Sequence, residues 1–66
     1  PMDKTFEIAV DKNAINALIS KKEIALEEAV NNAEWYASLG LDGMADNEVA
    51  RQEKLIRDIE RLKAAI

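Results

Sequence analysis

The chain has 66 residues, a formal net charge of −4 and neither cysteine nor histidine. Disulfide bonds, the usual zinc sites and catalysis by a histidine base or a cysteine nucleophile are therefore excluded. The negative charge argues against nonspecific binding to nucleic acids or anionic membranes, and no apolar run approaches the ~18 residues that a membrane span requires.

A chain of this size can form only one small domain, which buries only about 60% of the surface that the unfolded chain exposes. Small domains usually add disulfides, a metal or a partner subunit to reach sufficient stability. This chain has no cysteine for a disulfide, and it has neither the cysteines nor the histidines of the usual zinc sites. We therefore expect a homo-oligomer. The lack of cysteine is compatible with a reducing compartment, and we expect a cytoplasmic protein.

Residues 2–12 have the alternating pattern of a half-buried strand, in which Phe6, Ile8 and Val10 are separated by other residues. The pattern predicts an N-terminal arm that is extended or a short strand. A lone strand of about six residues is not stable by itself and needs a neighbour. A helix remains an alternative for this segment, because Phe6 and Val10 are four residues apart.

Residues 13–39 have the pattern of an amphipathic helix, which Asp11 or Asn13 can cap. Its apolar face consists of Ile15, Ile19, Leu26, Ala29, Val30, Ala33 and Ala37. Ser20 and Glu23 can form a capping box, which would start a fresh helix at Ser20. The apolar face stays in phase across Ser20, however, and this favours one continuous helix.

Gly40 suits the left-handed conformation that commonly follows a helix, and Leu41 can then touch Tyr36 as in a Schellman motif. Asp42 and Gly43 are expected to continue the turn. Asp46 is the predicted cap of a second helix, which runs to the end of the chain.

The second helix has a heptad-like run typical of a coiled coil, formed by Gln52, Leu55, Ile59, Leu62 and Ile66. From Glu23 to Glu48 the chain has seven acidic residues and no basic one, whereas Arg51 to Lys63 has five basic and three acidic residues. This difference favours packing of the two helices against each other. One alignment of the two helices pairs apolar residues with apolar residues and acidic residues with basic ones. In this register the numbers of paired residues add to about 85. It pairs Leu26 with Ile59, Val30 with Leu55, Tyr36 with Val49, Glu34 with Arg51 and Glu28 with Arg57.

We therefore predict an all-α fold: an antiparallel helical hairpin at residues 13–66, with helices at about 13–39 and 46–66 and a short N-terminal arm. We expect it to assemble as a dimer or a higher helical bundle. The predicted core consists of Ile15, Ile19, Leu26, Val30, Ala33, Val49, Leu55, Ile56, Ile59 and Leu62.

Ile24 and Trp35 lie roughly opposite the apolar face of the first helix, about three turns apart. A two-helix hairpin leaves that side in water, and tryptophan is enriched at the centres of protein interfaces. We predict an interface there, formed by Ile24, Glu27, Glu28, Asn31 and Trp35. Trp35 is expected to be covered by a second subunit or another protein.

The residues suggest three other kinds of site. Trp35 and Tyr36, with Arg51 nearby, can form a stacking shelf for a nucleotide or another flat ligand. The glutamates of the first helix suggest a carboxylate metal site, but such bundle sites need histidines, so no metal and no cofactor is expected. The basic residues of the second helix are interspersed with acids, which makes nucleic-acid binding unlikely.

Three functions remain open. The first is a small non-catalytic protein that acts by protein–protein interaction, as an inhibitor, adaptor or regulator of the kind common in phages and mobile elements. The second is an oligomer that sequesters a small molecule or nucleotide between subunits. The third is a purely structural assembly unit. We do not expect an enzyme.

Overall fold

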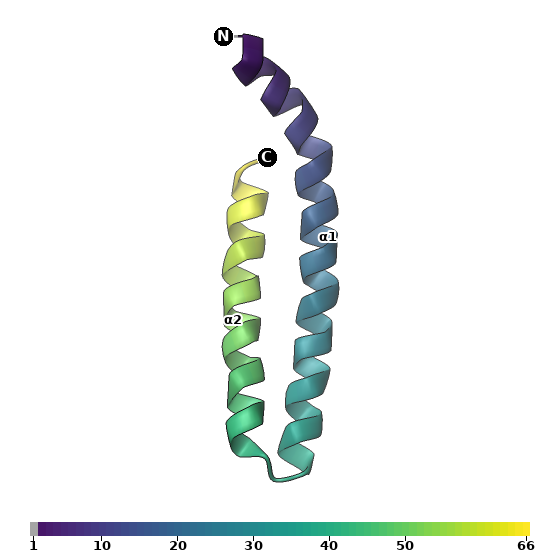
Figure 1. The fold of residues 1–66 in the computed structure, drawn as a ribbon, viewed down its shortest axis with the longest axis vertical. Coiled ribbons are helices and arrows are strands. Elements are labelled where there is room, and N and C mark those ends of the chain that lie inside the picture. Colours follow the sequence, from purple (N-terminus) through teal and green to yellow (C-terminus); the bar gives the residue numbers. More distant parts are fainter. Residues whose placement is uncertain (1) are drawn as a thin grey trace.

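The computed structural model describes the backbone of residues 2–66 and the side chains of residues 12–66. Two α-helices, α1 (Met2–Ser38) and α2 (Asp42–Ala64), are joined by a short turn. They lie side by side and antiparallel, in a rod with extents of 55 × 14 × 13 Å (Figure 1). The predicted all-α helical hairpin is confirmed.

The beginning of α1 differs from the prediction. The backbone is helical from Met2, so residues 2–12 are not an extended arm and the helix does not begin at Asn13. A single strand would leave its backbone N–H and C=O groups without partners, whereas a helix pairs them within the segment. The alternation of Phe6, Ile8 and Val10 concerns side chains that lie outside the described ones.

α1 continues through Ser20 without a break, as the phase of its apolar face predicted. It has 37 residues and α2 has 23, which correspond to about 55 Å and about 35 Å at 1.5 Å per residue. The N-terminal end of α1 therefore extends past the C-terminal end of α2 by about 20 Å, as Figure 1 shows.

The turn has the geometry expected of Gly40. Its φ of 76° is the left-handed conformation that a side chain disfavours. The Gly40 N–H donates to the Ala37 carbonyl at 3.0 Å, and the Leu41 N–H donates to the Tyr36 carbonyl at 2.9 Å. These two bonds make up the Schellman motif and satisfy carbonyls at the end of α1 that have no helical partner.

α2 begins at Asp42, so the prediction that Asp46 caps this helix is wrong. The Schellman turn leads directly into α2. Leu41 occupies the cap position without a side-chain hydrogen bond, and its carbonyl accepts the Ala45 N–H at 3.0 Å. Asp42 lies in the first turn, where its carboxylate is favoured by the positive end of the helix dipole.

This earlier start changes the register of the two helices. Lys22 contacts Asp58 and Asn32 contacts Glu48, and the numbers of both pairs add to 80 rather than about 85. Gln52 and Ala29 add to 81, whereas the longer contact between Lys63 and Glu23, at 3.9 Å, adds to 86. The shift is close to one helical turn, because the connection is about one turn shorter than predicted. Leu26 consequently lies level with Leu55, one turn away from its predicted partner Ile59.

The predicted ion pairs change with the register. Arg51 pairs with Glu48 at 3.5 Å instead of Glu34. Lys22 pairs with Asp58 at 3.4 Å, and Lys63 pairs with Glu23 at 3.9 Å. Neither Glu34–Arg51 nor Glu28–Arg57 is found among the ion pairs of residues 12–66. Like an apolar stripe, a row of charges repeats about every turn, so the sequence pattern fits either register.

The seam between the helices is narrow. Four apolar residues are buried among those described, namely Ile19, Ala29, Ala45 and Ile59. Of the predicted core, Ile15, Leu26, Ala33, Leu55 and Leu62 are half-buried, whereas Val30, Val49 and Ile56 are exposed. Ala29 is completely buried, and its carbonyl accepts a hydrogen bond from Gln52 of α2.

We predict that Gly40→Ala destabilises the protein by about 1–2 kcal/mol, the cost of a left-handed backbone for a residue with a Cβ. A Cβ at Gly40 meets nothing within 4 Å, so the effect is purely conformational. Gly43→Ala is the matched control, because Gly43 is helical and also open; it should stabilise by about 0.5–1 kcal/mol. Urea unfolding followed by circular dichroism, at one fixed protein concentration, measures both. Equal effects of the two substitutions would contradict the turn geometry.

The register predicts which charges are coupled. Alanine substitutions of Lys22 and Asp58, singly and together, should give a coupling energy of about 0.2–1 kcal/mol that decreases with salt. The same cycle for Glu28 and Arg57, which the sequence pairs in the other register, should give none. Coupling in the second cycle but not in the first would place the helices one turn away from the register described.

Candidate functional site

The outer face of α1, which we define as Ile24, Glu27, Glu28, Asn31 and Trp35, points away from α2. All five residues are exposed. Ile24 and Trp35 are each 62% exposed, more than any other large apolar side chain described. Successive residues of a helix are about 100° apart, which places both roughly opposite the seam residues of α1. The hairpin leaves this predicted interface uncovered, as expected for a single chain.

The charge of the outer face is uniformly negative. Glu27, Glu28 and the neighbouring Glu34 are exposed and make no ion pair with residues 12–66. The basic residues of α2 do not reach them, because α2 lies against the opposite side of α1. A surface that combines a tryptophan and an isoleucine with unpaired carboxylates favours a partner with the complementary apolar and basic groups.

Trp35 is held on a firmly fixed part of the backbone. Its carbonyl accepts a hydrogen bond from the Ser38 hydroxyl at 2.7 Å and another from the Leu39 N–H at 3.3 Å. Both bonds anchor the last turn of α1 immediately before the Gly40 turn. The indole is thus presented by a rigid element, and binding would order little more than its own two side-chain torsions.

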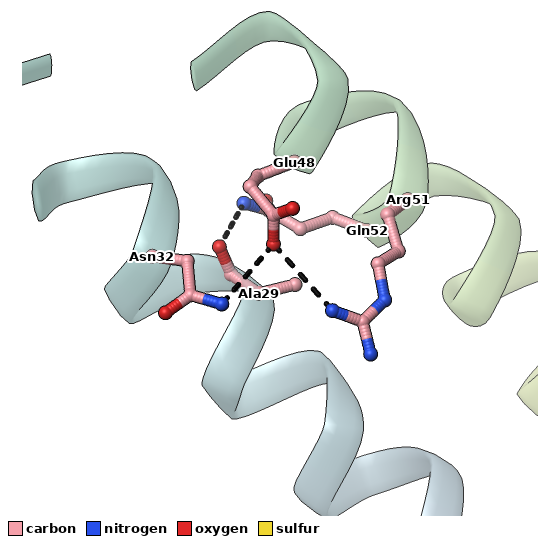
Figure 2. Close-up of polar contacts among 5 residues, drawn as sticks. All are labelled: Ala29, Asn32, Glu48, Arg51 and Gln52. Carbon is pink, nitrogen blue, oxygen red and sulfur yellow. Dashed lines mark hydrogen bonds and ion pairs between the residues drawn. The ribbon is translucent and has the colours of Figure 1, made fainter. Parts of the chain in front are cut away.

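A polar cluster that was not predicted from the sequence lies at the margin of the seam (Figure 2). Glu48 accepts a hydrogen bond from the Asn32 amide at 3.3 Å and forms an ion pair with Arg51 at 3.5 Å. The Gln52 amide donates to the Ala29 carbonyl across the seam at 3.4 Å. Polar groups of this kind specify the alignment of helices more than they stabilise it. The signal in the sequence was Gln52, a polar residue within an otherwise apolar heptad-like run.

The stacking shelf predicted from Trp35, Tyr36 and Arg51 is not assembled within one chain. Trp35 points outward, whereas Tyr36 is half-buried toward α2, since consecutive residues are about 100° apart. Arg51 is paired with Glu48 beside Asn32. A version of this site formed between subunits stays a prediction.

One shallow open depression lies beside Lys22, Asp58, Arg61 and Leu62. Lys22 and Asp58 pair with each other at 3.4 Å, so the depression has no unpaired carboxylate to offer a ligand. Among the residues searched, no group of three or more acidic side chains is placed to hold a metal ion. Neither helix, over its described length, is apolar enough to cross a membrane.

Comparison with models of protein families, with curated proteins and with solved structures finds no match. The functional assignment therefore depends on the surfaces described above.

The fluorescence of Trp35, the only tryptophan, reports on the outer face directly. We predict red-shifted emission and efficient quenching by neutral acrylamide in the purified protein, because the indole is 62% exposed. A control protein with Trp35→Phe and Tyr36→Trp moves the indole to the half-buried neighbouring position. That protein should emit further to the blue and be quenched less. Blue, protected emission from Trp35 in the purified protein would mean that the chain itself covers this face.

Proposed function

We propose that this protein is a non-catalytic binding module, an inhibitor, adaptor or regulator, whose outer face of α1 docks onto a partner protein. The observation that carries the proposal is the exposure of Ile24 and Trp35, each 62%, in line on one side of a rigid helix. The packing of the hairpin uses neither residue, so their position has no explanation within the hairpin.

The two apolar residues suit the role of anchors. They are eleven positions apart, about 16 Å along the helix axis, a span that one face of a partner domain can cover. Tryptophan is among the residues whose truncation most weakens interfaces, commonly by about 2 kcal/mol or more. The partner we infer has an apolar groove for the indole and the isoleucine.

The acidic rim indicates the charge of that partner. Glu27, Glu28 and Glu34 surround the apolar anchors, and the described side chains leave them unpaired. Lysine or arginine residues bordering the groove would complement them and accelerate association at low ionic strength. A nucleic acid or an anionic membrane would be repelled by the same residues.

The composition supports a role without catalysis. The chain has no histidine or cysteine. The hydroxyl of Ser38 is engaged by the Trp35 carbonyl at 2.7 Å, and Ser20 is exposed on a helix with no histidine base to activate it. These features leave recognition as the chemistry that the surface can perform.

The proposal predicts that Trp35→Ala weakens partner binding by about thirtyfold, which corresponds to about 2 kcal/mol. The partner is first isolated from host cells by affinity capture with the wild-type protein, and titration calorimetry then measures its affinity. Ile24→Ala should have a smaller effect in the same direction, and added salt should slow association. The helical circular dichroism of both variants should be unchanged, since neither side chain packs in the seam.

Met44→Ala is the matched control, because Met44 is also exposed and apolar but belongs to α2. It should bind the partner like the wild type. A partner whose affinity depends on Met44 and not on Trp35 or Ile24 would overturn the assignment of the outer face.

A further inference from the structure

We propose that the side of α2 that points away from α1 is a second docking surface, and that its occupant is the outer face of α1 in another copy of this chain. Copies then join side by side, with the acidic side of one rod against the basic side of the next. The inference rests on the function proposed above, because it names a partner for the same face of α1.

Three basic residues lie in line on this side of α2. Lys54 is nine positions after the buried Ala45. Arg57 and Arg61 each lie two positions from the buried Ile59. At about 100° per residue, these spacings place the three basic residues about 160–180° around the helix from the buried ones. All three are exposed, and none makes an ion pair with a described side chain. Their charges are therefore available to a partner with acidic groups.

The outsides of the two helices carry rows of residues with matching spacing. On α1, steps of three, four, three and four residues connect five exposed positions, namely Ile24, Glu27, Asn31, Glu34 and Ser38. On α2, the same steps read in the opposite direction connect five exposed positions, namely Ala64, Arg61, Arg57, Lys54 and Ala50. Such steps keep residues on one side of a helix, so two antiparallel helices can meet along both rows. We call them the acidic row and the basic row.

Antiparallel pairing of the two rows brings opposite charges together. When the residue numbers add to 88, Glu27 of one copy is level with Arg61 of the next. In the same register Glu34 is level with Lys54. The helices of the hairpin are antiparallel (Figure 1), so a copy shifted sideways without turning presents its α1 in the required direction. A second copy thus supplies an acidic helix with the spacing and the direction that the basic row requires.

Two acidic residues of α2 lie beside the basic row but not in it. Glu53 and Glu60 are exposed, and they lie about 60–80° around the helix from the middle of the row, toward Val49 and Ile56. The basic row carries three positive charges and no negative one, whereas the acidic row carries two negative charges and no positive one. Facing rows of opposite charge attract each other, and two copies of the same row repel.

The same contact covers apolar surface on the outer face of α1. Ile24 is level with Ala64, whose small side chain leaves room for it, and Trp35 follows Glu34 at the edge of the contact. Ile24 and Trp35 are each 62% exposed in the single chain. Because the two rows are different surfaces, each added copy presents a free row to the next, and assembly continues as an open ribbon or closes into a ring.

Sedimentation velocity of the unmodified protein at low ionic strength is the first test. The average mass should rise above the 7.4 kDa of the chain as the concentration increases from micromolar to submillimolar, and it should fall again with added salt. The emission of Trp35 should be red in the dilute protein and move to the blue as the mass rises. A mass of 7.4 kDa at every concentration would overturn the inference. The proposed function would survive that result if a partner captured from host cells still depends on Trp35.

Reversing the charges of each row then identifies the contact. Glu27→Lys with Glu34→Lys makes the acidic row basic, and Lys54→Glu with Arg61→Glu gives the basic row a net negative charge. Each variant alone should associate about tenfold more weakly than the wild type or worse, because like charges then face each other. An equimolar mixture should associate again, since each variant retains the row that the other has lost. A mixture that stays monomeric while the wild type associates would overturn the inference.

Glu53→Lys with Glu60→Lys is the matched control, because it makes the same change in net charge at two exposed positions seven residues apart that lie outside both rows. This variant should associate at least as strongly as the wild type. Loss of association here as well would mean that net charge governs assembly instead of the two rows, and it would overturn the inference. Circular dichroism should show the same helix content for every variant, since all the substituted side chains are exposed.

Discussion

The left-handed turn at Gly40 determines which residues of the two helices meet. The connection from α1 to α2 consists of Leu39, Gly40 and Leu41, and it leaves no slack for sliding one helix along the other. Asn32 is therefore level with Glu48, and Lys22 is level with Asp58. The polar contacts of the seam follow from this register.

Two helices can bury only a thin seam, and two of the four buried residues described are alanines. Ala29 and Ala45 bring the helices close, at the cost of the apolar area that larger residues would bury. Apart from Ile19 and Ile59, the larger apolar side chains described are half-buried or exposed. In α2 they lie mainly on one side, whereas in α1 they point in more than one direction, toward α2 and away from it. Ten large apolar side chains among those described are therefore exposed.

Features that depend on a few neighbouring residues were easier to predict from the sequence than features that depend on the length of the turn between α1 and α2. Gly40 and the continuity of α1 across Ser20 were predictable, since each follows from backbone preference or helical phase over a few residues. The register was not, because Asp46 is a good candidate for a helix cap whereas Leu41, which occupies the cap position, is not, and because the apolar and charged rows repeat every turn. The outer face was identifiable because Ile24 and Trp35 lie opposite the core pattern. The cluster around Glu48 was not, because it forms only in the correct register.

The short turn between the two helices also determines the order in which they pair during folding. Every contact between them is made across one tight turn, so the residues nearest Gly40 are separated by the shortest stretch of chain and have the least entropy to lose on meeting. Pairing can then spread outward, one turn at a time, toward Glu23 and Lys63. The open end of the hairpin would form last and open first, and amide hydrogen exchange should quicken steadily with distance from the turn. In a chain arranged in this way, pairing of the helices begins at the turn and proceeds toward the open end.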